Sequence, residues 1–346
     1  MFTTDLHKDL LTLASRYDRD QVAVVCLQHS GVSCQLSEFP TLLLETSEEL
    51  KSLATVERIW DFLLEKGITR RGLLICIGGG VLTDLGGFAA ATYKSGIDYI
   101  NVPTTLLAMV DASSGGKTGF NYHGLKNAIG AFHAPVETLI YPSLLSTLPA
   151  REMLSGFGEM LKTGLLDNGQ WTMDNGQYLW NRLLQYDLER MDIAELTPLV
   201  EACVRVKEEI VAADPKETGL RKALNLGHTF GHALEEISIQ HSDASLQHGY
   251  AVVYGLIAEL YLSITKLGCP REPLQQMTQL MLHYYGRPQC KCSDREQLIA
   301  LMRQDKKNER TAEINCTLLK RIGEPVINQV ITDDEAHEAL DYLFSL

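Results

Sequence analysis

The sequence lacks the features that direct a chain into or across a membrane. No stretch approaches the roughly eighteen uninterrupted apolar residues that a membrane-spanning helix requires. The first residues, Met1 to Asp9, contain no apolar segment of the kind found in secretory signals. We therefore expect a cytoplasmic protein without a membrane partner.

Cysteine pairs and positive charge are also scarce. The eight cysteines show no regular spacing, and Cys290 and Cys292 form the only close pair. One CxC pair is a weak metal signal, so we expect reduced thiols. Acidic residues outnumber basic ones by 44 to 31, which gives a formal charge of -13. This charge repels nucleic-acid phosphates and argues against a nucleic-acid partner. A small anionic ligand would need a local group of basic residues.

The composition that is present belongs to an ordinary soluble globular protein, 45% hydrophobic and 22% charged. A length of 346 residues is sufficient for two domains, each with its own core. Strand-like runs alternate with helical patterns up to about residue 146, after which long helical patterns dominate. We expect an α/β domain with a parallel sheet at residues 1–147 and an all-helical domain at residues 148–346.

Continuous apolar and β-branched runs predict the strands of the first domain. They cover residues 21–27, 39–45, 72–77 and 99–102, with helices expected at 5–17, 46–66 and 85–93. Apolar residues at helical spacing predict the helices of the second domain. These cover residues 150–166, 171–185, 193–213, 221–239 and 249–267.

Two glycine-rich segments of the first domain are candidates for ligand binding. Gly78, Gly79 and Gly80 stand where a strand gives way to a helix, where a backbone without side chains can approach a phosphate. The spacing is not GxGxxG, so the common dinucleotide fingerprint is missing. The second segment places Lys117 after Gly115 and Gly116, and it fails the spacing of a P-loop.

Polar residues around this second segment suit an anionic ligand. Asp111 and Lys117 flank the glycines, and Lys126 and Asn127 follow closely. Two lysines, an aspartate and an asparagine on glycine-rich turns are suited to hold a polar anion. The alternative for each lysine is an ordinary solvated side chain.

Three histidines in the second domain predict a metal site. His228 and His232 lie four residues apart and share one face of a helix, and His248 follows next to a glycine. Imidazoles in this pattern suit a divalent metal, most often zinc, when a carboxylate completes the set. Glu159 is the candidate carboxylate, with Lys162 three residues later. The alternatives are surface histidines and a surface ion pair. Spacing alone would make His228 and His232 both ligands.

Several motifs in a fixed order carry a resemblance to a known family. They are GGGVLTDLGGFAAATY, VPTTLLAMVDASSGGKTG, LKNAIGAF, LPAREMLSGFGEMLKTGL, LNLGHTFGHALE and HGYAV. Over residues 45–325 the chain resembles the 3-dehydroquinate synthases of the sugar phosphate cyclase superfamily. That resemblance implies an N-terminal NAD-binding α/β domain, a C-terminal helical metal-binding domain and a homodimer.

The resemblance also implies an activity. The family converts a phosphorylated sugar acid, 3-deoxy-D-arabino-heptulosonate 7-phosphate (DAHP), to 3-dehydroquinate and phosphate in the second step of the shikimate pathway. Its cofactors are NAD and a divalent metal, zinc or cobalt. In the reaction a substrate hydroxyl is transiently oxidised, phosphate leaves by elimination, hydride returns, and the ring opens and recloses by an intramolecular aldol step.

The resemblance assigns roles to individual residues. The metal ligands would be Glu159, His228 and His248, which moves His232 from the metal to the substrate. The substrate would be bound by Asp111, Lys117, Asn127, Lys162, Lys207, Arg221, Asn225 and His232, with one or both of Lys306 and Lys307. NAD would be bound by Glu48, Lys51, Gly79, Gly80, Val81, Asp84, Thr104, Thr105, Lys126 and Thr147.

The chain departs from the family pattern in two places. Ser95 stands where a phosphate-contacting arginine is expected, and the adjacent Lys94 offers a point charge in place of a bidentate fork. The acidic residue expected after the first strand, which would hold the adenosine ribose, is matched at best by Gln28. The segment from there to Phe39 is also short. We therefore hypothesise weaker binding of NAD or substrate than in a full-length relative.

Three other functions stay open. The first is a cyclase that acts on glucose 6-phosphate or on a sedoheptulose phosphate. His232, Asn127 and Asn225 argue against the sedoheptulose phosphate. Another is an NAD- and metal-dependent polyol or alcohol dehydrogenase, which would accumulate NADH where a cyclase would not. The third is a non-catalytic binding or scaffold protein, supported by Ser95 and the short N-terminal region alone.

Overall fold

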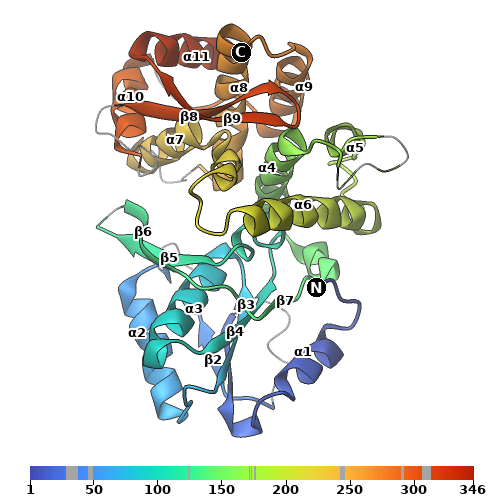
Figure 1. Ribbon diagram of the computed structural model, residues 1–346, viewed down its shortest axis with the longest axis vertical. Coiled ribbons are helices and arrows are strands. Elements are labelled where there is room, and N and C mark those ends of the chain that lie inside the picture. Colours follow the sequence, from blue (N-terminus) through green and yellow to red (C-terminus); the bar gives the residue numbers. More distant parts are fainter. Residues whose placement is uncertain are drawn as a thin grey trace. The chain divides into compact units, whose positions relative to one another are not determined.

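The chain divides into two compact units, unit 1 at Met1–Met153 and unit 2 at Leu154–Leu346. The computed structural model describes residues 1–28, 38–45, 50–123, 125–170, 172, 174, 177–241, 246–289, 292–305 and 313–346. Figure 1 colours the chain from blue at its N-terminus to red at its C-terminus. The domain boundary predicted between residues 147 and 148 stays a prediction.

The centre of unit 1 is a five-stranded parallel sheet in the order β2-β1-β3-β4-β7. Its strands are β1 (Val22–Leu27), β2 (Thr41–Leu44), β3 (Leu73–Gly78), β4 (Asp98–Pro103) and β7 (Glu137–Thr138). β1 lies between β2 and β3, so the strand that follows β1 in the chain pairs on one side of it and the next strand pairs on the other. The strand order therefore reverses direction at β1. Open α/β sheets bind ligands at such a switch point, outside the carboxyl ends of the strands.

Helices cover both faces of this sheet. They are α1 (Leu6–Ala14), α2 (Leu53–Glu65) and α3 (Gly80–Thr92). Ala23 and Val25 of β1 belong to the core beneath α2 and α3, and Val22 and Val24 belong to the core beneath α1. Strands that are buried on both faces read as continuous apolar runs, which is why the sequence predicts them. The expected parallel α/β layer is confirmed, and its layers are visible in Figure 1.

Unit 1 also contains an antiparallel hairpin of β5 (Lys117–Tyr122) and β6 (Leu125–Phe132). The glycines of this region predict that Lys117, Lys126 and Asn127 lie on turns, and this prediction is wrong. Gly115 and Gly116 make the turn with positive φ angles of 90° and 66°, and strand pairing begins at Lys117. The two lysines therefore lie on opposite strands of one ribbon.

Unit 2 is built mainly from helices. They are α4 (Ala150–Leu166, which begins in unit 1), α5 (Leu179–Gln185), α6 (Ile193–Ala213), α7 (His228–His241), α8 (His248–Leu267), α9 (Glu272–Leu280), α10 (Arg295–Gln304) and α11 (Asp333–Ser345). The helical prediction is confirmed in its main part but needs one correction. β8 (Ile314–Arg321) and β9 (Glu324–Ile331) form an antiparallel hairpin, so the unit is not all-helical.

The central helix of unit 2 is α8, which contacts α7, α11 and β8. Most of its residues are buried, and the backbone N–H of Leu319 in β8 donates to Ser263 Oγ at 2.9 Å. Among the described helices, α8 alone is long and apolar enough to cross a membrane. However, 67% of its apolar stretch is buried within the protein, as in the core helix of a globular unit.

Helix boundaries differ from the predicted ones where glycine or a tight turn intervenes. α7 begins at His228, seven residues later than predicted, because Leu220–Asn225 forms a 3₁₀ turn and Gly227 adopts a φ of 79°. α3 begins at Gly80, before the predicted start at residue 85. The region at 46–49, predicted to begin the helix that becomes α2, lies outside the described residues. The later start of α7 places His228 in its first turn.

Candidate metal and nucleotide sites

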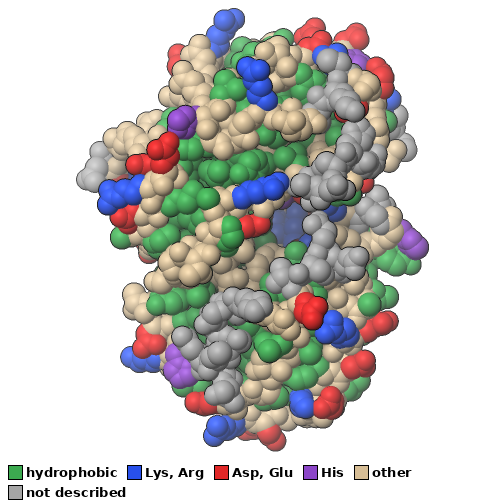
Figure 2. Space-filling view, turned by 180° about the vertical axis from the view of Figure 1, so that it is seen from behind, with side chains coloured by type: hydrophobic (Ala, Val, Ile, Leu, Met, Phe, Trp, Pro, Cys, Tyr) green, Lys and Arg blue, Asp and Glu red, His purple; other side chains and the backbone are tan. Residues whose placement is uncertain are grey.

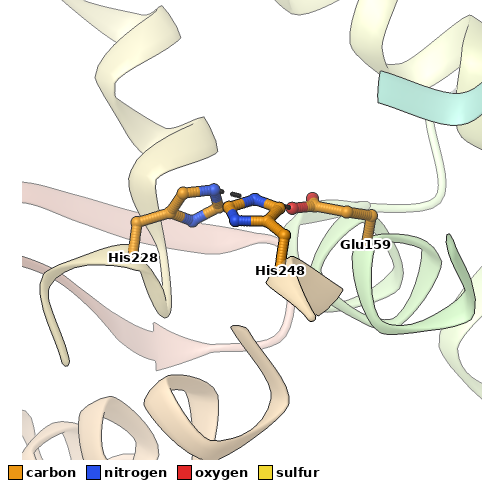
Figure 3. A group of neighbouring side chains, drawn as sticks. All are labelled: Glu159, His228 and His248. Atoms are coloured by element: carbon orange, nitrogen blue, oxygen red, sulfur yellow. Dashed lines mark ion pairs between the residues drawn. The ribbon is translucent and has the colours of Figure 1, made fainter. Parts of the chain in front are cut away.

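Glu159, His228 and His248 lie together in unit 2, and each comes from a different helix (Figure 3). Glu159 is in the middle of α4, and the two histidines are the first residues of α7 and α8. One ligand atom of each residue lies within 4.8 Å of the other two. Glu159 Oε1 is 3.1 Å from His248 Nε2 and 3.5 Å from His228 Nε2. The three side chains therefore point to one shared position.

Glycines let these helices approach closely enough for the side chains to meet. Gly249, in the first turn of α8, lies against α4, and a Cβ there would come within 1.7 Å of the Ser155 carbonyl oxygen. Gly255, two turns along α8, lies against the residue before α7. A Cβ there would come within 1.9 Å of the Gly227 carbonyl oxygen. A side chain at either position would push the helices apart.

The start of α7 is held by Glu259, a fully buried residue of α8. Its carboxylate accepts the backbone N–H groups of Gly227 at 2.6 Å and Thr229 at 3.2 Å. A carboxylate suits this place because a helix N-terminus carries unpaired N–H groups and partial positive charge. Sequence reasoning missed Glu259. Its signal is that it is the only charged residue between residues 249 and 265.

Each candidate ligand histidine uses its second ring nitrogen for an outer contact. His228 Nδ1 lies 3.0 Å from the Leu226 carbonyl oxygen, and His248 Nδ1 lies 3.3 Å from Glu235 Oε2. These acceptors favour the tautomer with hydrogen on Nδ1, which leaves Nε2 for the shared position. Burial would lower the pKa of His248, but the Glu235 and Glu159 carboxylates raise it to about 10. Metal binding would displace that proton.

The donor set fits a divalent metal. Two imidazole nitrogens and one carboxylate oxygen are the ligands of many catalytic zinc sites, and cobalt shares these preferences. Ligand atoms on one tetrahedral zinc ion lie roughly 3.4 Å apart. The two separations from Glu159 Oε1, 3.1 and 3.5 Å, are close to that value. Glu159 Oε2 lies 2.5 Å from Lys162 Nζ. One oxygen of the carboxylate therefore contacts Lys162, and the other, Oε1, faces the shared position.

His232 lies beside this group, one turn further along α7. Its ring centroid is 5.2 Å from that of His228 and 6.0 Å from that of His248. Its Nδ1 lies 3.0 Å from Oδ2 of Asp305, whose side chain is 5% exposed. The geometry therefore groups His228 with Glu159 and His248, and it joins His232 to Asp305. Asp305 was also missed, because an acid at a helix end reads as a surface residue.

The other substrate candidates of unit 2 lie on α6 and on the loop that follows it. Lys207 is buried in α6, and Arg221 is buried in the 3₁₀ turn Leu220–Asn225. Arg221 Nη1 donates to the Pro215 carbonyl oxygen at 2.7 Å. Asn225 Nδ2 donates to Glu217 Oε1 at 3.0 Å. Local contacts therefore hold both side chains.

In unit 1, part of the predicted NAD set gathers at the carboxyl ends of β3 and β4. Gly79 precedes the first turn of α3 and lies against Thr105, so that a Cβ on Gly79 would be 3.1 Å from Thr105 Cγ2. The Thr104 N–H donates to the Gly78 carbonyl oxygen at 3.0 Å. A close backbone and a helix N-terminus suit a phosphate, and β3 borders the switch point of the sheet.

The remaining NAD and substrate candidates of unit 1 are distributed over several elements. Lys51 Nζ lies 2.5 Å from Asp84 Oδ2, and these side chains are 13% and 15% exposed. Other candidates are Val81 in the first turn of α3, Lys126 and Asn127 in β6, Lys117 at the start of β5, Asp111 in the turn Ala108–Ala112 and Thr147 at the end of the turn Pro142–Thr147. Glu48, Lys306 and Lys307 lie outside the described residues, as does most of the segment from Gln28 to Phe39.

The segment that lacks the expected arginine has a particular backbone. Lys94 and Ser95 adopt positive φ angles of 47° and 67°, which non-glycine residues rarely do. Lys94 Nζ donates to the Ile68 carbonyl oxygen at 2.7 Å and lies over the Tyr93 ring. The Lys94 ammonium is therefore engaged by its own unit, which argues against Lys94 as the substitute phosphate contact.

The charge of the chain is not gathered into one patch on the face that Figure 2 draws. Among the described residues of that face, Asp and Glu side chains and Lys and Arg side chains are both scattered between apolar areas.

Comparison with known proteins identifies both halves of the chain. Residues 41–155 match the family model for the N-terminal part of 3-dehydroquinate synthase, and residues 156–308 match that for its C-terminal part. The 3-dehydroquinate synthase of Parabacteroides distasonis is 44% identical over 346 residues. This alignment covers 98% of the present chain and 95% of the relative.

Solved structures share the fold. ValA, the 2-epi-5-epi-valiolone synthase of Streptomyces hygroscopicus subsp. jinggangensis with NAD⁺ and Zn²⁺ bound, is 27% identical with a TM-score of 0.83, and the match covers 100% of this chain and 96% of ValA. A 2-deoxy-scyllo-inosose synthase complexed with carbaglucose-6-phosphate, NAD⁺ and Co²⁺ is 22% identical with a TM-score of 0.82, and the match covers 98% and 95%. This second likeness concerns the fold alone. From the matches along both of its halves, the chain belongs to the 3-dehydroquinate synthase family.

Proposed function

We propose that the chain converts DAHP to 3-dehydroquinate and phosphate, the second step of the shikimate pathway that leads to chorismate and the aromatic amino acids. Family membership over almost the whole chain supports this activity. The observation that carries it is the meeting of Glu159, His228 and His248, from three helices, at one position. The enzyme is an NAD- and metal-dependent lyase of the cyclase type.

The residues that would hold the cofactors lie in separate units. Glu159, His228 and His248 would hold zinc or cobalt, which polarises substrate oxygens when bound. The loop at Gly79 and Gly80 would hold the NAD pyrophosphate, and NAD supplies the reversible hydride acceptor. The remaining NAD residues are proposed to be Glu48, Lys51, Val81, Asp84, Thr104, Thr105, Lys126 and Thr147. The ValA structure, which has both NAD⁺ and Zn²⁺ bound, supports this pair of cofactors.

Basic side chains would neutralise the carboxylate and phosphate of the substrate. Lys162, Lys207 and Arg221 are buried, where water screens a charge less than at the surface. Charge-assisted hydrogen bonds from such groups are stronger than neutral ones. The rest of the proposed substrate set is Asp111, Lys117, Asn127, Asn225 and one or both of Lys306 and Lys307. A chain with an overall charge of -13 could thus bind a polyanion.

His232 is the residue that we assign to the phosphate and to proton transfer. Asp305 lies at its Nδ1, so Nε2 is the nitrogen presented for a hydrogen bond or a proton. The side chain is 35% exposed, in contrast to the buried Glu159. A group within hydrogen-bond reach of a leaving oxygen assists departure by donating a proton to it.

The two departures from the family pattern would weaken binding. Ser95 supplies no guanidinium, and Lys94 is held at Ile68. Gln28 supplies no carboxylate for the adenosine ribose. We expect Michaelis constants for NAD or DAHP above those of a full-length relative measured side by side. Equal constants would remove this part of the proposal.

The setting that we propose is a cytoplasmic homodimer that acts on a small phosphorylated sugar acid, without a nucleic-acid or membrane partner. Buried thiols support a reducing compartment: Cys76, Cys203 and Cys269 form no disulfide, and burial raises the pKa of each. Sedimentation of the purified chain would report its oligomeric state.

Phosphate release from DAHP is the direct test of the activity. We expect release by the chain with NAD and zinc or cobalt, loss of release with a chelator or without NAD, and recovery when metal returns. Absence of release from the folded, fully loaded chain would refute the activity. Net NADH accumulation would instead favour a polyol dehydrogenase.

A further inference from the structure

A carboxylate outside the ligand group faces one of the candidate ligand imidazoles. We propose that Glu235 is a positioning residue of the metal site, which fixes the tautomer of His248 and strengthens its Nε2 as a ligand. This inference rests on the proposed metal-dependent function. It adds a residue that the ligand set Glu159, His228 and His248 does not contain.

The His248 ring lies between two carboxylates. On one side its Nε2 is 3.1 Å from Glu159 Oε1, and on the other its Nδ1 is 3.3 Å from Glu235 Oε2. The Glu235 side chain is 8% exposed, so water screens its charge weakly. A ligating histidine commonly donates its second N–H to a carboxylate, which orients the ring and raises its basicity. Glu235 occupies the place of that outer carboxylate.

The fold holds Glu235 in this place. It lies seven residues, or two turns, after His228 and therefore on the same face of α7. Ser238 Oγ donates to the Glu235 carbonyl oxygen at 2.7 Å and accepts the Leu246 N–H at 2.9 Å. Leu246 comes two residues before His248. This pair of hydrogen bonds ties the approach to α8 to the turn of α7 that carries Glu235.

The two histidines differ in the charge of their outer partner. His228 Nδ1 faces a neutral carbonyl oxygen, that of Leu226, whereas His248 Nδ1 faces the Glu235 carboxylate. Hydrogen bonds to an ionised acceptor are roughly twice as strong as neutral ones. Removal of the Glu235 charge should therefore weaken the His248 ligand and leave the other ligands in place.

Metal affinity, measured without turnover, tests the role of Glu235. The metal-free full chain competes with a chromophoric chelator for zinc or cobalt, and circular dichroism reports that each variant is folded. We expect Glu235→Ala to weaken the metal affinity about 10–100-fold. Glu235→Gln should weaken it less, since its amide oxygen still accepts the hydrogen bond. Glu236→Ala, a control at the next position of α7, should leave the affinity unchanged.

Each outcome separates this inference from the proposed function. Wild-type affinity in folded Glu235→Ala and Glu235→Gln would overturn the role of Glu235, and Glu235→Gln alone decides if the alanine variant does not fold. An equal loss in Glu236→Ala would assign the effect to the helix and overturn it as well. His228→Ala is the reference for the site. If His228→Ala keeps the wild-type metal affinity, the metal site itself is refuted. If His228→Ala loses metal affinity while Glu235→Ala keeps it, only the role of Glu235 is refuted.

Discussion

At the residue scale, the Nδ1 atoms of three neighbouring histidines meet three different acceptors. His228 meets a backbone carbonyl, His248 meets Glu235, and His232 meets Asp305. In each ring the other nitrogen, Nε2, is the one left for a ligand, and its direction follows from the acceptor. What groups His228 with His248 is Glu159 Oε1, which lies near the Nε2 atom of each, although all three rings are within 6.0 Å of a neighbour.

Asp305→Asn is expected to lower kcat about tenfold or more, because a carboxylate that orients a general acid contributes part of its 10²–10⁴-fold effect. The Michaelis constants should change less, and metal content should stay at the wild-type level. Steady-state kinetics and metal analysis measure the three quantities, and Asp305→Glu should recover part of kcat. Loss of metal together with kcat would assign Asp305 to the metal site instead.

At the element scale, close helix packing builds the candidate metal site. α4 and α8 approach at Gly249, and α7 and α8 approach at Gly255. These contacts have no space for a methyl group, since the obstructing atoms are backbone oxygens that cannot rotate away. Glu259 then fixes the start of α7 from within α8. The ligand positions are thus consequences of the backbone packing as much as of the ligands' own side chains.

Gly249→Ala should separate α8 from α4 and move His248 away from Glu159. We expect a loss of about 1–3 kcal/mol in the free energy of unfolding, as for other overpacked sites, together with weaker metal binding. Denaturant unfolding and metal competition report the two effects. Thr265→Ala, at the exposed end of the same helix, is the matched control and should change neither. Wild-type stability and metal affinity in Gly249→Ala would show that the helices can separate without consequence.

An ion pair at the C-terminal end of α8, between Lys266 and Glu335, should make a pH-dependent contribution to stability. Glu335, in the first turn of α11, lies 2.5 Å from Lys266 Nζ, and this hydrogen bond holds the pKa of the Glu335 carboxyl below its usual 4.5. A lowered folded-state pKa stabilises the fold above the unfolded pKa, and that contribution is lost as pH falls through the folded value. Glu335→Gln should therefore lower Tm at pH 7 by a few degrees. The difference should shrink as pH falls below 4.5 and through the lowered pKa of Glu335. An equal difference in Tm at every pH would exclude a charge effect.

At the scale of the whole molecule, the candidate residues for the two cofactors lie in different units. The NAD candidates lie in unit 1, at the carboxyl end of a parallel sheet, and the metal candidates lie in unit 2, between packed helices. Each unit has its own buried core, so each site is supported by the fold around it. Binding of the two cofactors should then be separable.

Chelation of the metal is expected to leave the NAD dissociation constant within about threefold of the loaded value, a coupling below the 5–150-fold typical of allostery. In the converse experiment, Gly79→Val should lose NAD binding, because its side chain would crowd Thr105 and block the backbone. The same variant should keep its metal. Calorimetric titration with NAD and metal analysis test both statements, and a large loss of NAD affinity on chelation would join the two sites.

The predictable part of the fold consists of elements whose pattern depends on burial alone. The bounds of α4 and α6 agree with the predicted ones, and the core strands differ by one or two residues. The hairpins β5–β6 and β8–β9 were not predicted. Lys117–Tyr122 reads KTGFNY and contains no continuous apolar run. A two-stranded ribbon does not require the continuous apolar run of a strand that is buried on both faces.

The candidate site also has one part that the sequence predicts and another part that it does not. Glu159, His228 and His248 are visible as residue types, but spacing cannot separate His228 from His232 because both share one face of α7. Glu235, Glu259 and Asp305 act through contacts with residues at other positions of the chain. In sequence Glu235 and Asp305 resemble the acids of any helix surface, whereas Glu259 stands out as the only charged residue between residues 249 and 265. The packing is what shows the contacts of all three.

The central claim is that two histidines of α7 have different roles: His228 binds the metal, and His232 acts on the substrate. Metal content and phosphate release from DAHP, measured on His228→Ala and His232→Ala beside the wild-type chain, test it most directly. We predict that His228→Ala loses both the metal and phosphate release. We predict that His232→Ala keeps the metal at the wild-type level and loses phosphate release about 10²–10⁴-fold. Full metal content in His228→Ala, or loss of metal in His232→Ala, would contradict this division.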